Sequence, residues 1–267
     1  MDFLDYSFMQ RALLSGFAIG IVCPLMGMFL VLRRLSMIGD ALAHVSMAGI
    51  ATGLILGLNP TITALISTMT ASLLIDLLRK TYSKFAEIAI AIIMAGGLGI
   101  GIILITIGGS NTANVMSYLF GSIIAISPFD LFIILIISLI ILTFMIVFYN
   151  KLFFIAFDEE AARLNGIPVN FINILFMLLT AMTVAVSIKV TGILLISALM
   201  TIPVATSIQI ARSFKQTSFF SILFALLSVF FGLISSFYFN WPPGGTIIVI
   251  SLLILIVVLF VKKLSRF

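Results

Sequence analysis

The sequence predicts an all-α protein, a polytopic integral membrane bundle of about nine transmembrane helices. Of its 267 residues, 63% are hydrophobic and only 9% are charged, whereas soluble domains are about a quarter charged. The mean hydropathy is +1.36. A soluble core of this length has no room for so much apolar surface, so lipid must be the solvent of most of the chain. In lipid, helices satisfy every backbone polar group within one segment.

The apolar runs give the number of spans, since about 20 apolar residues cross a bilayer as a helix. The second and third runs are separated only by Leu58, Asn59 and Pro60, so a hydropathy window could fuse them and give eight spans. No soluble appendage interrupts the series, and residues 1–267 are expected to form a single transmembrane domain. The nine runs are 12–32, 41–58, 61–78, 86–108, 129–149, 170–188, 192–211, 217–238 and 245–261.

The basic residues predict the orientation, because Lys and Arg in short loops gather on the cytoplasmic side. If the first helix runs from outside to inside, twelve of the 14 basic residues lie inside, and only Arg11 and Lys189 lie outside. The sequence therefore predicts an outer N-terminus and a cytoplasmic C-terminus, and the net charge of +5 needs no nucleic acid to explain it. The inner residues are Arg33, Arg34, Arg79, Lys80, Lys84, Lys151, Arg163, Arg212, Lys215, Lys262, Lys263 and Arg266.

Glycines spaced four apart form smooth faces on three of the predicted helices. Small residues at this spacing allow helices to approach closely in lipid. We expect close helix contacts along Gly16/Gly20, Gly49/Gly53/Gly57 and Gly97/Gly101.

Motifs of covalent chemistry are missing from the sequence. It has no G-x-x-x-x-G-K-[ST] phosphate loop, no H-E-x-x-H, no G-x-S-x-G and a single histidine. A hydrolase needs a base, a nucleophile and an orienting group that converge. The chain is therefore expected not to be an enzyme, and it has no recognisable cofactor site.

The stretch Gly39-Asp40-Ala41-Leu42-Ala43-His44 offers a candidate metal site. Asp40 and His44 stand four residues apart, so a helix places them on one face. Ionisable groups inside a span are costly and usually mark a pathway or a site, and imidazole with carboxylate suits zinc or manganese. A structural Asp40–His44 hydrogen bond, or Asp40 as a helix N-cap, is the alternative. Met37 and Met47 continue the same stripe.

The longest polar interruption, from Asn150 to Pro168, contains a short predicted helix. Asp158 can cap it, Glu159 and Glu160 favour its N-terminus, and Gly166 can end it. Ala161 and Ala162 would form a small face that suits a groove on a partner protein.

Four other charged residues lie close to predicted span ends and are interpreted as interfacial anchors. They are Asp76, Glu87, Asp130 and Lys189.

Several of these stretches together resemble the permease subunits of bacterial ABC importers for zinc, manganese or iron. The matches run in order along nearly the whole chain. They are Arg33-Arg34-Leu35-Ser36 with Gly39–His44, Ser117–Ser122, Phe157–Gly166, Thr191–Leu195 with Ile202-Pro203, and Pro243-Gly244-Gly245-Thr246.

The resemblance implies a fold, a function and partners. The expected protein is a multi-pass subunit of the bacterial plasma membrane that forms the pathway of an ATP-driven importer of a divalent metal. Its implied partners are a second copy of itself, separate cytoplasmic ATPase subunits and an extracellular metal-binding protein. Asp40 and His44 would contact the ion in transit. The coupling helix near 158–166 would comprise Asp158, Glu159, Glu160, Ala161, Ala162 and Gly166.

The choice of metal follows from the same resemblance. Gly39–His44 looks closer to the zinc-type members, with manganese-type members next. One departure is Gly96, which stands after Ile93-Met94-Ala95 where some zinc permeases carry a histidine. Because Gly39–His44 is the closer match, zinc stays the first expected cargo despite Gly96, and manganese is the second. The alternative function is a secondary transporter of a small solute that uses an ion gradient and needs no ATPase.

Overall fold

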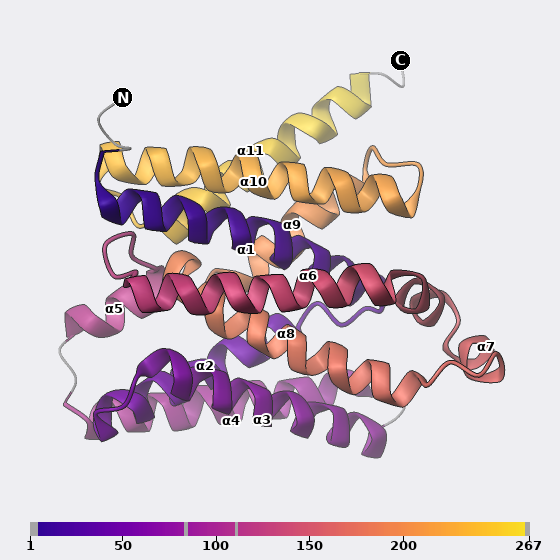
Figure 1. The fold of residues 1–267 in the computed structure, drawn as a ribbon, viewed down its shortest axis with the longest axis horizontal. Coiled ribbons are helices and arrows are strands. Elements are labelled where there is room, and N and C mark those ends of the chain that lie inside the picture. Colours follow the sequence, from indigo (N-terminus) through magenta and orange to yellow (C-terminus); the bar gives the residue numbers. More distant parts are fainter. Residues whose placement is uncertain (1–4, 83–84, 110–111, 265–267) are drawn as a thin grey trace.

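The computed structural model describes residues 5–82, 85–109 and 112–264, and all regular structure in these ranges is helical. Figure 1 shows the helices running roughly side by side along the longest axis of the molecule. In chain order they are α1 (Ser7–Leu32), α2 (Ile38–Leu56), α3 (Pro60–Thr81), α4 (Ala86–Ile107), α5 (Thr112–Phe120), α6 (Pro128–Phe157), α7 (Glu159–Leu164), α8 (Val169–Thr191), α9 (Ile196–Ile208), α10 (Phe214–Phe239) and α11 (Pro243–Leu264).

Eight of the described helices are long and apolar enough to cross a membrane. They are α1, α2, α3, α4, α6, α8, α10 and α11, and they coincide with eight of the nine predicted spans. The main difference in length is at α6, which continues to Phe157 instead of ending near 149. The predicted membrane bundle is confirmed, and α5 is an addition to it.

The remaining predicted span, the seventh in chain order at 192–211, needs a correction. The helix in this region, α9, has only 13 residues, which is about 20 Å at a rise of 1.5 Å per residue. Gly192 takes a left-handed φ of 82°. The backbone N–H groups of Ile193 and Leu194 then donate to carbonyls at the end of α5, at 2.9 and 3.3 Å. These bonds draw the first residues of the apolar run out of the helix.

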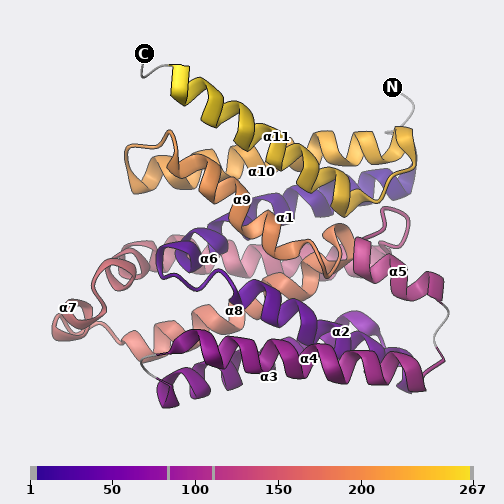
Figure 2. The ribbon, with the colours of Figure 1, turned by 180° about the vertical axis from the view of Figure 1, so that it is seen from behind.

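The directions of the helices agree with the predicted orientation, in which the N-terminus is outside and the C-terminus is inside. In Figures 1 and 2, α1 begins and α11 ends at opposite ends of the long axis, and α9 returns the chain between α8 and α10. We call the end that carries α7 the cytoplasmic end, and the opposite end the outer end. The helix bounds place the predicted inner basic residues at the cytoplasmic end, while Lys84 and Arg266 lie outside the described residues.

The bundle has central and peripheral helices. Figure 1 shows α2, α3 and α4 on one side, α6 and α8 in the middle, and α1, α10 and α11 on the other side. Helix α8 packs against α1, α2, α3 and α6. In the most apolar stretch of α1 and of α8, 67% is buried, compared with 22% for α4 and for α11. Helices α4 and α11 therefore present most of their surface to the outside of the bundle.

The glycine faces are helix contacts, as predicted. A Cβ atom added to Gly49 would lie 2.8 Å from the carbonyl oxygen of Thr63 on α3. A Cβ atom at Gly97 on α4 would lie 2.9 Å from the Cα of Val45 on α2. Gly57 differs, because it ends α2 in the left-handed conformation, with φ 66° and open space around it.

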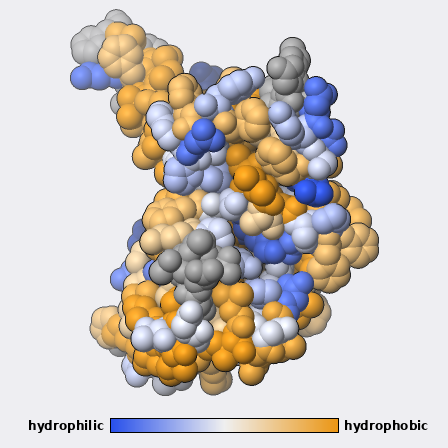
Figure 3. Space-filling view, turned by 90° about the vertical axis from the view of Figure 1, so that its left-hand side faces the viewer, coloured by the Kyte–Doolittle hydropathy of each residue, from blue (hydrophilic) through white to orange (hydrophobic). Residues whose placement is uncertain are grey.

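The outer end carries a polar region and an aromatic turn. Figure 3 looks onto this end, where hydrophilic residues gather near the middle and hydrophobic ones towards the lower and right-hand margins. The turn between α10 and α11 holds Trp241, whose ring stacks on that of Phe239 with 4.9 Å between their centroids. Trp241 also lines an outer pocket of about 300 Å³.

Candidate functional site

The Asp40 and His44 side chains lie one turn apart on α2. The helix begins at Ile38, with Met37 as its N-cap, so Asp40 falls in the first turn. Both residues are half-buried. The spacing of four therefore puts a carboxylate and an imidazole on one helix face, as the sequence predicted.

Neither side chain has a partner within the described chain, where no hydrogen bond or ion pair engages Asp40 or His44. The Nδ1 atom of His44 is buried and makes no hydrogen bond to any described residue. The structure thus shows no Asp40–His44 hydrogen bond, and Met37 occupies the N-cap position that Asp40 was alternatively expected to take. A buried polar nitrogen without a partner is costly and calls for an explanation.

The described chain offers few metal ligands in any one place. The described residues contain no group of three or more His, Cys, Asp and Glu side chains suited to a metal ion. Of the two methionines on the stripe, Met37 is 51% exposed, whereas Met47 is buried. Because Met47 packs beside Gly101 of α4, it fills space between helices.

The predicted coupling helix is α7. Asp158 is its N-cap and accepts a hydrogen bond from the backbone N–H of Ala161 at 2.8 Å. Gly166 follows the helix in the left-handed conformation, with φ 75°. The capping and termination expected from the sequence are therefore present, and Figure 1 shows α7 protruding from the cytoplasmic end.

The surface of α7 corrects one expectation. Ala162 is fully buried against the chain itself, so the expected two-alanine face is reduced to Ala161, which is half-buried. Two apolar side chains beside it are exposed instead: Leu164 at 88% and Phe157 at 65%. The sequence does carry a sign of this exposed surface, because Leu164 is an apolar residue within a polar interruption. Averaging the hydropathy over a window hides it.

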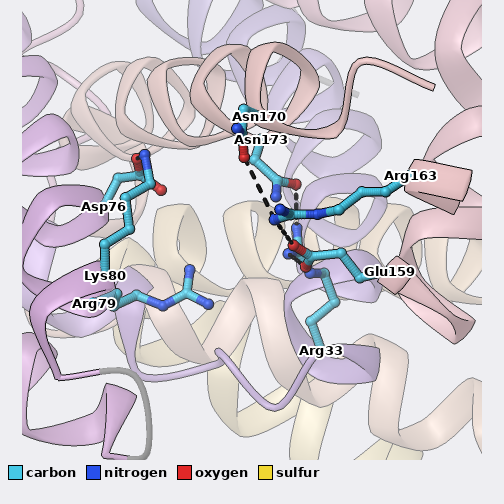
Figure 4. Close-up of a pocket in the computed structure, with 8 residues that line it drawn as sticks. All are labelled: Arg33, Asp76, Arg79, Lys80, Glu159, Arg163, Asn170 and Asn173. Atoms are coloured by element: carbon cyan, nitrogen blue, oxygen red, sulfur yellow. Dashed lines mark hydrogen bonds and ion pairs between the residues drawn. The ribbon is translucent and has the colours of Figure 1, made fainter. Parts of the chain in front are cut away.

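A group of charged and amide side chains lies where α7 meets the bundle, around a cavity of about 110 Å³ (Figure 4). Arg33 caps the C-terminus of α1 and pairs with Glu159 of α7 at 3.2 Å. Burial lowers the pKa of the Arg33 guanidinium, and Glu159 opposes this shift. The cavity is lined by Arg33, Asp76, Arg79, Lys80, Glu159, Arg163, Asn170 and Asn173.

At the outer end, Asp130 and Lys189 are not the interfacial anchors that their positions near span ends suggested. The Lys189 ammonium lies 2.6 Å from the Asp130 carboxylate, and the side chains are 14% and 2% exposed. Asp130 also accepts a hydrogen bond from the Thr61 hydroxyl at 2.9 Å. The two residues form a buried ion pair between α6 and α8. Sequence separation gave no sign of it, since these residues are 59 positions apart.

Known proteins share this arrangement over almost the whole chain. Residues 5–262 match the profile of the family described as the ABC 3 transport family. The chain belongs to the ABC 3 transport family. This ABC 3 permease is 38% identical over 263 residues to the probable metal transport system membrane protein of Treponema pallidum, with 98% of each chain covered.

Other similar proteins are named for particular metals. The manganese import system permease protein ScaB of Streptococcus gordonii is 31% identical, with 98% of this chain and 94% of that one covered. The high-affinity zinc uptake system membrane protein ZnuB of Haemophilus influenzae is 29% identical, with 94% and 97% covered. The structure of PsaBC from Streptococcus pneumoniae in complex with Fab matches at a TM-score of 0.85, with 31% identity and coverage of 96% and 92%.

Family membership confirms the resemblance seen in the sequence. The ABC 3 permease is a multi-pass membrane subunit of the plasma membrane, and its relatives are transport subunits and not enzymes. ATP hydrolysis belongs to a separate subunit in this family, as expected from the missing phosphate loop.

Proposed function

We propose that this permease forms the translocation pathway of an ATP-driven importer of a divalent transition metal, with zinc as the first candidate and manganese as the second. The similarity to proteins named for metal, manganese and zinc transport supports the cargo class. The relatives named for manganese and for zinc are nearly equal in their sequence identity to this chain. The preference for zinc therefore rests on the Gly39–His44 resemblance.

The single observation that carries the proposal is the unpartnered Asp40 and His44 pair. A carboxylate oxygen and an imidazole nitrogen are ordinary ligands of zinc and manganese. Both groups are half-buried on α2, and Nδ1 of His44 has no partner within the described chain. A passing metal ion would offset the cost of placing these groups in low dielectric.

The proposed site needs more ligands than one chain brings. A second copy that presents the same α2 face would add a further carboxylate and imidazole. Zinc in structural sites is usually held by four ligands, but an ion that is held too well does not leave. We propose that the pathway lies between two copies, that an external binding protein delivers the metal, and that the ion passes Asp40 and His44.

The cytoplasmic partner in this proposal is an ATPase subunit that docks on α7. Leu164 and Phe157 are large apolar side chains exposed on or beside this helix, and exposed apolar patches commonly mark protein interfaces. Ala161, Asp158, Glu160 and Gly166 would complete the contact. This differs from the coupling set expected from the sequence in three ways: Leu164 and Phe157 are added, Ala162 is buried and supports the helix from within, and Glu159 pairs with Arg33 and Arg163.

The test is uptake of radioactive zinc and of manganese into proteoliposomes that contain the permease, its ATPase subunits and the binding protein. His44→Gln keeps a hydrogen-bonding side chain and Asp40→Asn keeps the shape while removing the charge. Each is expected to lower uptake per assembled complex by more than about 10-fold, since mutating the groups that merely support metal ligands already costs about 10–100-fold. Met37→Leu is the matched control on the same stripe and should transport normally.

Three outcomes would count against the proposal. Wild-type uptake in both His44→Gln and Asp40→Asn would remove these residues from the pathway. Uptake by the permease alone, driven by an ion gradient, would favour the secondary-transporter alternative. Faster uptake of manganese than of zinc at equal concentration would reverse the order of the two metals.

A further inference from the structure

The cytoplasmic ion cluster connects the coupling helix to the helix end that precedes the metal site. The side chain of Arg33 is only 12% exposed, and its guanidinium has two acceptors on two different helices. Its Nη1 donates to Oδ1 of Asn173 on α8 at 2.8 Å, and its Nη2 donates to Oε2 of Glu159 on α7 at 3.2 Å. Figure 4 shows these side chains converging from separate elements.

The other ion pairs of the cluster stay within single helices, and a longer hydrogen bond, from Nη2 of Arg163 on α7 to Oδ1 of Asn170 on α8 at 3.4 Å, also crosses between helices. Glu159 also pairs with Arg163 at 2.7 Å, one turn along α7. Asp76 pairs with Lys80 at 2.7 Å, one turn along α3. Across the cavity, Nε of Arg79 has no hydrogen-bond partner among the described residues. In the described part of the chain, Arg33–Glu159 is thus the ion pair that ties α7 to another element.

Arg33 is also joined to the start of α2 by a short and tightly bonded turn. Arg34 takes a left-handed φ of 57°, a conformation that non-glycine residues adopt only when their surroundings impose it. The N–H of Leu35 donates to Leu30 at 2.7 Å, and the N–H of Ile38 donates to Leu35 at 3.0 Å. This bonded turn is all that separates Arg33 from Ile38, which lies two residues before Asp40.

We propose that the Arg33–Glu159 ion pair is the link through which movement of α7 reaches the first turn of α2, and so Asp40 and His44. This inference rests on the proposed function and adds two positioning residues to it. An ATPase that shifts α7 would pull on Glu159, then on Arg33, and then on the α1–α2 turn. The guanidinium suits this role because its two Nη groups hold the α7 and α8 acceptors in a fixed planar geometry, which a lysine ammonium lacks.

The first test measures metal transported per ATP hydrolysed in the full complex. Arg33→Gln and Glu159→Gln are each expected to lower this ratio about tenfold, within the usual range of a coupling free energy. The exchanged pair Arg33→Glu with Glu159→Arg restores an ion pair between α1 and α7 and should recover much of the ratio. Lys80→Gln is the matched control, because it removes a cation from the same cavity wall without breaking a link between helices.

The second test needs no transport. Ser36→Cys places a thiol in the α1–α2 turn, and the native Cys23 is buried. The rate of maleimide labelling of the new thiol should change several-fold with Glu159→Gln and stay constant with Lys80→Gln. A labelling rate that is unchanged by Glu159→Gln would overturn the link. So would an exchanged pair whose ratio of metal to ATP is as low as that of Arg33→Gln. A wild-type complex without ATP-driven metal uptake but with Glu159-dependent labelling would overturn the proposed function and leave the link standing.

Discussion

Asp130 joins three helices at the outer end through a single carboxylate. It lies on α6, accepts from Lys189 on α8 at 2.6 Å and accepts from Thr61 on α3 at 2.9 Å. Ser127 and Asp130 also form the capping box that begins α6. The buried carboxylate of Asp130 is tolerated because it has a counter-ion and hydrogen-bond donors. Removing the counter-ion would leave an unpaired charge in a low dielectric.

Lys189→Met should therefore destabilise the permease, because it leaves the Asp130 carboxylate buried without its counter-ion. The expected loss in free energy of unfolding is about 3–5 kcal/mol. Thermal or denaturant unfolding of the purified protein in detergent measures it. The double variant Asp130→Asn with Lys189→Met removes both charges and should regain most of the stability. A single variant as stable as wild type would show that the pair contributes nothing.

At the scale of elements, helix α4 carries two adjacent glycines with opposite surroundings. A Cβ atom at Gly97 would meet the backbone of Val45 at 2.8 and 2.9 Å, whereas one at Gly96 meets nothing within 4 Å. Val45 neighbours His44, so the Gly97 contact sets how close α4 lies to the candidate metal site. The same helix thus contains a tightly packed position and a matched open one.

Gly97→Ala should push α4 away from α2 and cost about 1–3 kcal/mol of stability through overpacking. Gly96→Ala should be neutral or stabilising by up to about 1 kcal/mol, because alanine is the better helix former. Melting temperature in detergent, with metal uptake per complex, compares the two variants. Equal behaviour of the two variants would contradict the packing described for α2 and α4.

Elements formed by local chemistry could be predicted, and those formed by distant contacts could not. The α7 helix follows from Asp158 as a cap and Gly166 as a stop, which are signals within ten residues of each other. The shortening of α9 depends on hydrogen bonds from 193 and 194 to the end of α5, more than seventy positions earlier. A hydropathy profile shows one continuous apolar run there. It carries no information on the distant backbone carbonyls that accept hydrogen bonds from residues 193 and 194.

The candidate site shows the same division. The Asp40 and His44 pair was visible because their spacing of four puts them on one face of any helix. The partners of Arg33 were invisible, since Asn173 and Glu159 lie 140 and 126 positions away. Asp130 and Lys189 were misread for the same reason, because closeness to a span end does not reveal a facing charge.

For the whole molecule, the alternation of helix direction places the start of α1 and the end of α11 at opposite ends of the bundle (Figures 1 and 2). With basic residues gathered at the α7 end, the N-terminus should be outside and the C-terminus inside. An N-terminal tag should thus be labelled in intact cells, and a C-terminal tag only after permeabilisation. The reverse pattern would contradict the orientation, and two shielded tags would mean an even number of crossings.

Trp241 is the one tryptophan in the chain, and it stacks on Phe239 in the outer turn. The protein therefore carries a single natural fluorophore of this kind, at the end opposite α7. Its side chain is 57% exposed, so its emission should respond to quenchers in the external water and to anything that covers the turn. A change in this emission after nucleotide is added on the cytoplasmic side would show that a conformational change at the α7 end extends along the full length of the bundle.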